Sequence, residues 1–333
     1  MTDLAPEQYR VLSIQSHMVS GYCGNKAATF PLQTLGYDVD VLNTVQFSNH
    51  TGYPSWTGER LDAAKVQQLF DGLETNGLDK EYTHVLTGYI GNVDILKTIE
   101  NQVKKLKEKR PNLIFVCDPV MGDNGRLYVS PEIVPLYREI LTVADVITPN
   151  QFETETLSGI KITDLASAKL AAMKLHEEGG AKRIVITTLT LPSDQVPTAV
   201  RSDNGKATLD QPQPLYCMTS QVSDDGSILQ HLISFPTFEG YFTGTGDLFS
   251  AMTVARLQDY PHSLAHAIYK VVCTVNAITR LTWEHQRKNT RRAISGKPAD
   301  PNNVHACELR LIQGRKHIEH PDMTSSTILM TDI

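Results

Sequence analysis

The sequence predicts an α/β protein with a central, mostly parallel sheet, helices on both faces and an antiparallel edge. Apolar strand-like segments alternate with helix-like segments through the first half of the chain. Two of these segments, 113–117 and 145–147, are continuously apolar, as parallel strands covered on both faces are. Between 189 and 236 the helical period disappears and turn residues separate two strand candidates, which indicates the antiparallel edge.

The first half of the chain supplies the parallel strands and the helices that connect them. Strands are predicted at 11–15, 39–45, 83–86, 113–117, 145–147 and 184–187, and helices at 25–35, 63–73, 93–109, 152–157 and 165–178. Helix 93–109 has an apolar stripe opposite its lysines, which is typical of a helix lying on a sheet. Residues 43–56 are polar and aromatic without a regular period, so we predict a functional loop there.

The second half closes the domain. The antiparallel strand candidates are 215–219 and 229–235, and helices are predicted at 264–283 and 308–316. Residues 289–303 are polar with glycine and proline, and we expect them to be mobile. The sequence has no internal repeat. We therefore predict a flexible N-terminus (1–9), a single domain (10–320) and a C-terminal tail (321–333).

Composition excludes several classes of function. The chain of 333 residues is 41% hydrophobic and 20% charged and has no apolar run long enough for a membrane helix. A formal net charge of −6 argues against binding to nucleic acid. Its five cysteines are far apart, which fits neither a disulfide framework nor a zinc site. The polar, acidic N-terminus has no secretory signal, so a cytosolic protein is expected.

Polar residues follow the predicted parallel strands. Right-handed crossovers place the ligand crevice of such a sheet beyond the carboxyl ends of its strands. The residues that fall on this edge are Ser16, Gly88, Tyr89, Asp118, Thr148, Thr187 and Thr188.

The chain is organised around the stretch 241–252, Tyr-Phe-Thr-Gly-Thr-Gly-Asp-Leu-Phe-Ser-Ala-Met. Gly244 and Gly246 would let backbone N–H groups converge at a helix start, and this combination can bind a phosphate. Asp247 follows in the first helical turn. It is either a helix cap or the group that takes a proton from an attacking hydroxyl, and these residues alone leave both roles open.

Seven motifs together resemble the pyridoxal kinase family of the ribokinase-like superfamily. Gly-x-Gly-Asp and Asp-Pro-x-x-Gly-Asp are found across the superfamily, whereas the Ser-Asn-His-Thr-Gly-Tyr and Thr-Pro-Asn-Gln-Phe-Glu runs are much narrower. The motifs are Ser-Ile-Gln-Ser-His (13–17), Gly-Asn-Lys-Ala-Ala-Thr (24–29), Ser-Asn-His-Thr-Gly-Tyr (48–53), Thr-Gly-Tyr (87–89), Asp-Pro-Val-Met-Gly-Asp (118–123), Thr-Pro-Asn-Gln-Phe-Glu (148–153) and Gly-Thr-Gly-Asp (244–247).

The resemblance implies transfer of the ATP γ-phosphate to the 5′-hydroxyl of pyridoxal, pyridoxine or pyridoxamine, with Asp247 as base at the Gly244 and Gly246 turn. It also implies that Ser16 and Thr51 hydrogen-bond the pyridine ring. The other substrate contacts implied are Val45, Phe47, Tyr89 and Cys23, the last where vertebrate enzymes tend to have valine. Val45 and Phe47 could instead be ordinary core residues.

Asp118 and Asp123 lie five apart across a Pro-x-x-Gly turn, so their carboxylates can face one point and hold a cation, or can serve as turn and cap groups. The resemblance implies Mg²⁺ or another divalent cation with ATP, and a monovalent cation, K⁺ or Na⁺, nearby. The implied metal residues are Asp118, Asp123, Thr148, Glu153 and Thr187. The implied nucleotide contacts are Asp118, Tyr128, Asn150, Glu153, Thr187, Thr188, Phe238, Gly240, Thr243, Gly244 and Thr245.

Other functions stay open to different degrees. A dinucleotide-binding oxidoreductase needs Gly-x-Gly-x-x-Gly after the first strand, and the sequence lacks it there. A related kinase for hydroxymethylpyrimidine or a sugar shares the phosphate machinery, and a non-catalytic vitamer-binding protein is a third possibility. At least one of His17 and His50 is expected to be a hydrogen-bonded structural histidine. The resemblance further implies a homodimer in the cytoplasm, with a nuclear location left open and the vitamer preference undecided.

Overall fold

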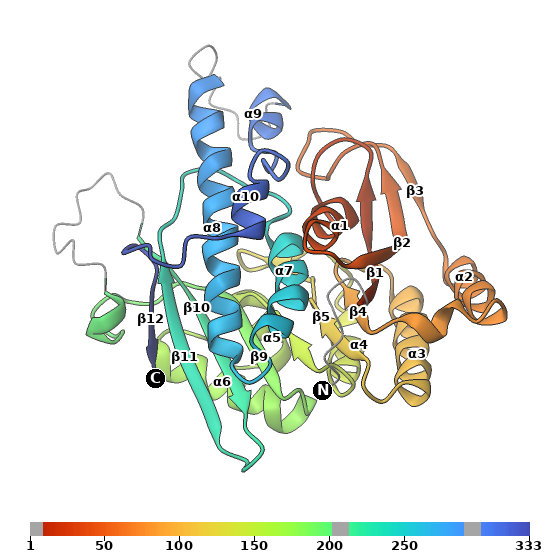
Figure 1. The fold of residues 1–333 in the computed structure, drawn as a ribbon, viewed down its shortest axis with the longest axis horizontal. Coiled ribbons are helices and arrows are strands. Elements are labelled where there is room, and N and C mark those ends of the chain that lie inside the picture. Colours follow the sequence, from red (N-terminus) through yellow and green to blue (C-terminus); the bar gives the residue numbers. More distant parts are fainter. Residues whose placement is uncertain (1–8, 202–212, 290–300) are drawn as a thin grey trace.

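A ten-stranded sheet forms the centre of the computed structural model, which describes residues 9–201, 213–289 and 301–333 (Figure 1). Six neighbouring strands, from β9 to β2, run parallel, and the flanking strands are antiparallel. The predicted fold class is confirmed. In sheet order the strands are β12 (Leu329–Asp332), β11 (Ile228–Phe235), β10 (Leu215–Val222), β9 (Arg183–Leu189), β8 (Val146–Ile147), β5 (Ile114–Cys117), β4 (His84–Thr87), β1 (Arg10–Met18), β2 (Asp38–Phe47) and β3 (Gly58–Arg60).

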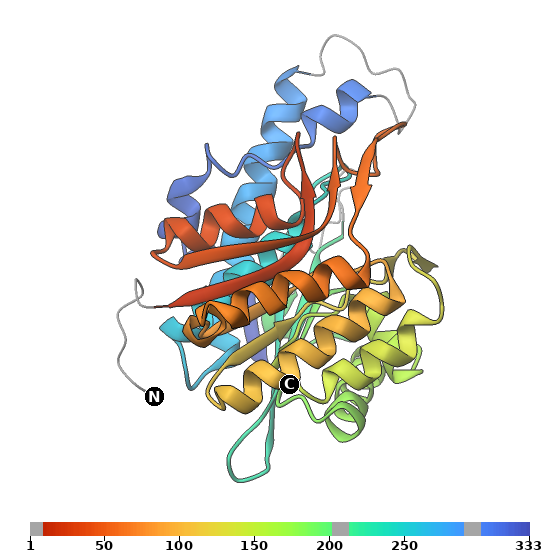
Figure 2. The same ribbon diagram turned by 90° about the vertical axis from the view of Figure 1, so that its right-hand side faces the viewer.

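Helices cover both faces of this sheet (Figure 2). One layer contains α2 (Ala63–Thr75), α3 (Val93–Lys109), α4 (Ile133–Leu141), α5 (Gln151–Ser158) and α6 (Leu165–Gly179). The other contains α1 (Asn25–Thr34), α7 (Thr245–Asp259), α8 (Leu264–Asn289) and α10 (Arg315–Glu319). The short α9 (Pro301–Ala306) packs on α8, and 3₁₀ turns span Leu78–Glu81 and Thr198–Val200.

Strand β1 shows why the sequence builds two cores. Val11 points into the core under α1, α7 and α8, whereas its neighbour Leu12 points into the core under α2 to α6. Successive residues of a strand face opposite sides, so a strand buried on both sides must be apolar throughout. From β1 the chain moves to β2 on one side and then to β4 on the other. The reversal places a crevice beyond the carboxyl ends of β1 and β4.

Several predicted boundaries are wrong. Residues 46 and 47, expected to belong to the irregular loop alone, are the end of β2, because Phe47 is buried on this strand and both residues pair with β3. The helix predicted at 308–316 is a turn followed by α10, since Leu309 and Leu311 anchor the segment in the core. The predicted tail contains β12, which pairs with β11. Helix α4 and the hairpin of β6 (Gly122–Asp123) with β7 (Arg126–Leu127) were not predicted.

Two predictions of mobility fall largely on residues 1–8 and 290–300, outside the described residues. None of the helices in the described part of the chain is both long and apolar enough to span a membrane.

Candidate active site

The Gly-Thr-Gly-Asp motif forms the start of α7. Gly244 caps this helix with φ 89°, and a Cβ at this position would lie 2.2 Å from the carbonyl oxygen of Tyr22, so both conformation and space require glycine. A helix start presents unpaired N–H groups and a partial positive charge. The hydroxyl of Thr243, just before the turn, is buried without a hydrogen-bond partner. The turn therefore has the unused polar groups of an anion site.

Asp247 is buried directly behind this turn. Its Oδ2 accepts a hydrogen bond of 2.7 Å from the N–H of Gly24, at the start of α1. Burial raises the pKa of Asp247, although hydrogen bonds from Gly24 and from the thiol of Cys23 oppose the rise. Ser16 lies beside Gly24, since a Cβ on Gly24 would be 2.5 Å from its hydroxyl oxygen. The structure thus brings Ser16, Cys23 and Asp247 together.

A small apolar cluster, separate from the two main cores, adjoins Asp247. It contains Met18, Val45 and Phe47, with Cys23 packed against them. The cluster lies at the carboxyl ends of β1 and β2, where the crevice is expected. Because Cys23 contacts both the cluster and Asp247, an aromatic ring held here would lie next to the carboxylate.

Asp118, at the end of β5, belongs to the same group of carboxylates. Burial, followed by the negative charges of Glu153 and Asp247, raises the pKa of Asp118 well above its usual range. Asp118, Glu153 and Asp247 are 5%, 3% and 9% exposed. Within the described part of the chain, none of them forms an ion pair with a lysine or arginine. Buried, unpaired carboxylates of this kind favour a bound cation.

Glu153 holds the loops around this group. Its Oε1 accepts from the N–H groups of Met121 (2.9 Å) and Gly122 (3.4 Å), and its Oε2 accepts from Asn150 (2.9 Å). Asn150 in turn caps α5 in a reciprocal capping box. Burial raises the pKa of Glu153 to about 7 despite these bonds. Glu153, an expected metal residue, therefore also links the 118–123 loop to the start of α5 through its hydrogen bonds.

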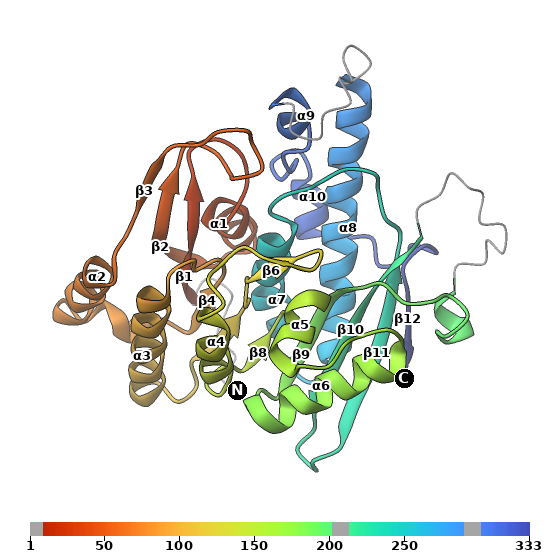
Figure 3. The same ribbon diagram turned by 180° about the vertical axis from the view of Figure 1, so that it is seen from behind.

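Asp123 lies at the edge of this acidic group: its charge helps to raise the pKa of Glu153 but is not among the causes of the shift at Asp118, and its role toward a cation stays a prediction. Both its carboxylate oxygens accept hydrogen bonds from Asn124, in the turn of the β6–β7 hairpin. This hairpin packs beside α5 (Figure 3). The carboxylates that act on Asp118 are Glu153 and Asp247, whereas the Asp123 side chain is held by Asn124 of its own loop.

The other predicted nucleotide residues lie in several separate segments. Tyr128, half exposed after the hairpin, hydrogen-bonds the exposed Tyr241. Thr148 has a buried hydroxyl without a partner, and Thr187 approaches the Pro149 carbonyl at 3.5 Å. Phe238 packs against Trp283 of α8, with ring centroids 5.4 Å apart and ring planes tilted by 37°.

The remaining predicted residues are placed as follows. Thr188 is a partly buried residue of β9, Gly240 has φ 144°, and the Thr245 hydroxyl donates to the Phe242 carbonyl at 3.3 Å. Thr51 is exposed in the 48–53 loop, and Tyr89 is partly buried after β4. Their roles toward a ligand stay predictions.

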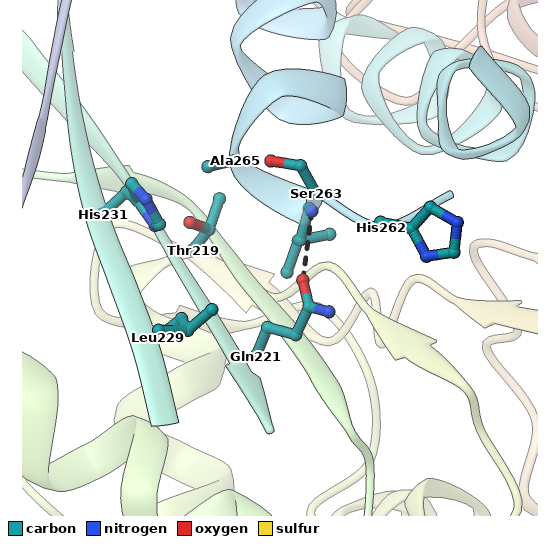
Figure 4. A pocket seen from close by; sticks show the side chains of 8 residues that line it. Thr219, Gln221, Leu229, His231, His262, Ser263 and Ala265 are labelled. Atoms are coloured by element: carbon teal, nitrogen blue, oxygen red, sulfur yellow. Dashed lines mark hydrogen bonds between the residues drawn. The ribbon is translucent and has the colours of Figure 1, made fainter. Parts of the chain in front are cut away.

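A small cavity elsewhere is not part of this site (Figure 4). It lies between β10, β11 and the start of α8, with Thr219, Gln221 and His231 among its lining residues. Thr219 pairs with Val185 near the beginning of β9. The cavity therefore lies toward the edge of the sheet opposite the carboxyl ends of the parallel strands.

Sequence reasoning missed two groups at the site. The N–H of Gly24 contacts Asp247, and the side chain of Glu308 contacts the 48–53 loop. The glycine preceding a helix after β1 was a detectable signal for the first group. Nothing in the pattern around Glu308 indicated a contact with a segment so far away in sequence.

Comparison with known proteins agrees with the geometry. Residues 37–291 match the family model described as phosphomethylpyrimidine kinase. Pyridoxal kinase of Arabidopsis thaliana is 43% identical over 94% of this chain and 92% of its own length, and that of Homo sapiens is 38% identical over 97% and 99%. The structure of Leishmania donovani pyridoxal kinase in complex with ADP and pyridoxamine superposes with a TM-score of 0.80 at 38% identity, covering 97% of this chain and 99% of that one.

These relatives are matched over nearly their whole length. The chain belongs to the pyridoxal kinase family.

Proposed function

We propose that this chain transfers the γ-phosphoryl group of ATP to the 5′-hydroxyl of pyridoxal, pyridoxine and pyridoxamine. The observation that carries the proposal is the position of Asp247, buried between the glycine turn of α7 and the apolar cluster of Val45 and Phe47. An acceptor hydroxyl held beside this carboxylate would face a phosphate held at the helix start.

In this mechanism Val45, Phe47 and Cys23 enclose the vitamer ring, while Ser16 and Thr51 bind its polar atoms and Tyr89 packs beside it. Asp247 accepts the proton of the 5′-hydroxyl as the oxygen attacks phosphorus. Backbone donors at Gly244 and Gly246 and the positive end of α7 stabilise the charge on the transferring group. Phosphoryl transfer needs little covalent help from a protein, so positioning and electrostatics supply most of the effect.

The residues present fit a divalent cation carried in with ATP. Among the described residues, no group of three or more histidine, cysteine or acidic side chains could hold an ion alone. Mg²⁺ usually binds through one or two carboxylates together with phosphates and waters, and the buried Asp118 with Glu153 can provide that share. The cation would neutralise charge on the phosphates.

A monovalent cation and the nucleotide contacts are further parts of the proposal. The unpartnered, buried hydroxyl of Thr148 and the nearby Thr187 suit K⁺ or Na⁺. Thr243 and Thr245 would meet the phosphates, Asn150 and Glu153 would border them, and Tyr128 would cover them from the hairpin. Thr188, Phe238 and Gly240 would lie farther along the nucleotide. We also propose that the protein is a cytoplasmic homodimer, which fractionation and light scattering would test.

A hydroxymethylpyrimidine kinase is the second candidate, because the matching family model carries a pyrimidine kinase description. The deciding experiment measures ATP consumption with pyridoxal, pyridoxine, pyridoxamine and hydroxymethylpyrimidine, each with and without Mg²⁺. We expect Mg²⁺-dependent turnover with the three vitamers. Turnover with the pyrimidine alone would support the second candidate, and no turnover with any of the four would refute both.

A further inference from the structure

The segment 307–309, between α9 and α10, lies against three loops of the site. Its Leu309 side chain lies 3.4 Å from the position a Cβ on Gly244 would occupy, and Cys307 accepts a hydrogen bond from the backbone of Tyr241. Glu308, between them, reaches the turn before α1 and the 48–53 loop. One short piece of chain thus joins three segments that are distant in sequence.

Glu308 makes these contacts with both carboxylate oxygens. Oε2 accepts from the backbone N–H of Tyr22 at 3.0 Å. Oε1 accepts from the hydroxyl of Tyr53 at 3.2 Å and lies 3.3 Å from Nε2 of His50. The side chains of Glu308 and His50 are only 11% and 5% exposed. Burial alone would raise the pKa of Glu308, but the hydrogen bonds from His50, Tyr22 and Tyr53 hold it below its usual value.

His50 links Glu308 to the backbone of the 48–53 loop. Its Nδ1 accepts from the N–H of Gly52 at 3.1 Å, so Nδ1 carries no proton and Nε2 carries the proton that faces Glu308. The carboxylate therefore selects the tautomer that can hold Gly52. Because Gly52 follows Thr51 directly, the bond fixes the backbone on one side of the residue assigned to the vitamer ring.

The surroundings are fitted to this carboxylate. A Cβ on Gly21 would lie 2.3 Å from Oε1 of Glu308, so a side chain there would displace the carboxylate from its present contacts, and the φ of 90° also favours glycine. A buried carboxylate is costly unless hydrogen bonds satisfy it, and Glu308 receives them from two elements of the site. An ordinary surface acid would not require this arrangement.

We propose that Glu308 is a positioning residue for vitamer capture: acting through His50, it holds the 48–53 loop in the form that presents Thr51 to the substrate. The role rests on the proposed function, because it concerns the same pocket. Glu308 does not touch the reacting atoms. Its loss should weaken binding of the vitamer while leaving the phosphoryl-transfer step and the binding of ATP intact.

The test compares Glu308→Gln with wild type in full steady-state kinetics. The carboxylate of Glu308 accepts hydrogen bonds on both oxygens, whereas the amide of glutamine has one accepting oxygen and one donating NH₂ group. In the variant, the NH₂ group must therefore face a donor that a carboxylate oxygen faces in wild type. We expect KM for pyridoxal to rise about tenfold, the effect of losing one strong buried hydrogen bond, while kcat and KM for ATP change less than about twofold. Glu319→Gln is the matched control, since it alters a partly exposed ion pair with Arg315 on the same C-terminal segment and should leave every constant unchanged.

A double-mutant cycle tests the route through His50. His50→Asn keeps an acceptor for Gly52 but cannot reach Glu308, so Glu308→Gln should have little further effect on KM in that background. Additive effects would overturn the route. Unchanged KM for pyridoxal in folded Glu308→Gln, or a loss shared equally by kcat and both KM values, would overturn the role itself.

If Glu308→Gln does not fold by circular dichroism, Glu308→Asp retains the charge with a shorter reach, and the same KM must rise in it. Wild type that fails to phosphorylate any vitamer would refute the proposed function, and this outcome is visible before any variant is made.

Discussion

The variant Asp247→Asn distinguishes between two roles of Asp247, a catalytic base and a helix cap. The amide oxygen of asparagine can still accept the 2.7 Å hydrogen bond from Gly24, so the geometry of the turn should survive. Burial raises the pKa of Asp247, which means that the ionised carboxylate is disfavoured in the folded state, and a neutral amide removes this cost. We therefore expect the melting temperature at neutral pH to be unchanged or higher, although the variant is catalytically impaired.

The loss should fall on kcat. General-base catalysis typically contributes about 10²- to 10⁴-fold, or about 3 to 5 kcal/mol of transition-state stabilisation. Single-turnover phosphorylation of pyridoxal with saturating ATP measures it directly. Asp259→Asn, the same substitution at the other end of α7, removes pairs with Arg256 and Lys270 and should leave kcat within about twofold.

The pH profile provides a second readout. A base must be unprotonated, so the kcat of wild type should fall as pH drops through the raised pKa of Asp247, whereas the residual activity of Asp247→Asn should lack this acid limb. A folded variant that binds both substrates and retains kcat within about threefold of wild type would refute the role of Asp247 as base.

Three other predictions follow from the site and the core. Ser16→Ala and Thr51→Val should each raise KM for the vitamers roughly fivefold with little change in kcat, and unchanged KM for all three vitamers in both variants would contradict the ring contacts. Asp118→Asn should weaken use of MgATP but leave vitamer binding without nucleotide, measured by calorimetry, nearly intact; equal loss of both would make the residue structural. Burial lowers the pKa of His84 to about 4, so the folded state favours the neutral ring; the free energy of unfolding should be unaffected above pH 6.5 and fall by about 3 kcal/mol as pH drops toward 4. Urea unfolding at several pH values should show a shallower acid decline in His84→Gln, and identical slopes would contradict it.

Much of the fold could be predicted because its strands are buried on both faces. Such strands must be continuously apolar, as 114–117 is, and the helix Val93–Lys109 was predicted to the residue because its apolar stripe and lysine face repeat without interruption. Short edge elements carry no comparable signal. Strand β12 is half exposed and depends on pairing with β11. The β6–β7 hairpin did carry a signal, the Asn124-Gly125 turn, which the sequence analysis did not use.

The site was predictable where a residue's role is set by its own segment. Gly244 and Asp247 are residue types that predict a helix start, and the structure places both at the start of α7. The direction of the Asp123 side chain was not predictable, because spacing alone cannot tell whether a carboxylate turns outward to a common point or back onto the next residue, and both its oxygens accept from Asn124. Glu308 could not be found from the pattern, since its function depends on contacts with residues 286 and 255 positions away, Tyr22 and Tyr53.

The carboxylates of Asp118, Glu153 and Asp247 explain why the site needs its substrates before it can act. Burial raises the pKa of all three, so without a counter-ion their full ionisation is unfavourable. A cation arriving with ATP would offset the charge of Asp118 and Glu153 and reduce the repulsion felt by Asp247. Because a base must be ionised to accept a proton, nucleotide and cation binding should lower the apparent pKa of Asp247 and extend activity to lower pH. The repulsion among these buried carboxylates would then couple the binding of nucleotide and cation to the ionisation of Asp247. The positions of the binding residues alone would not produce this coupling.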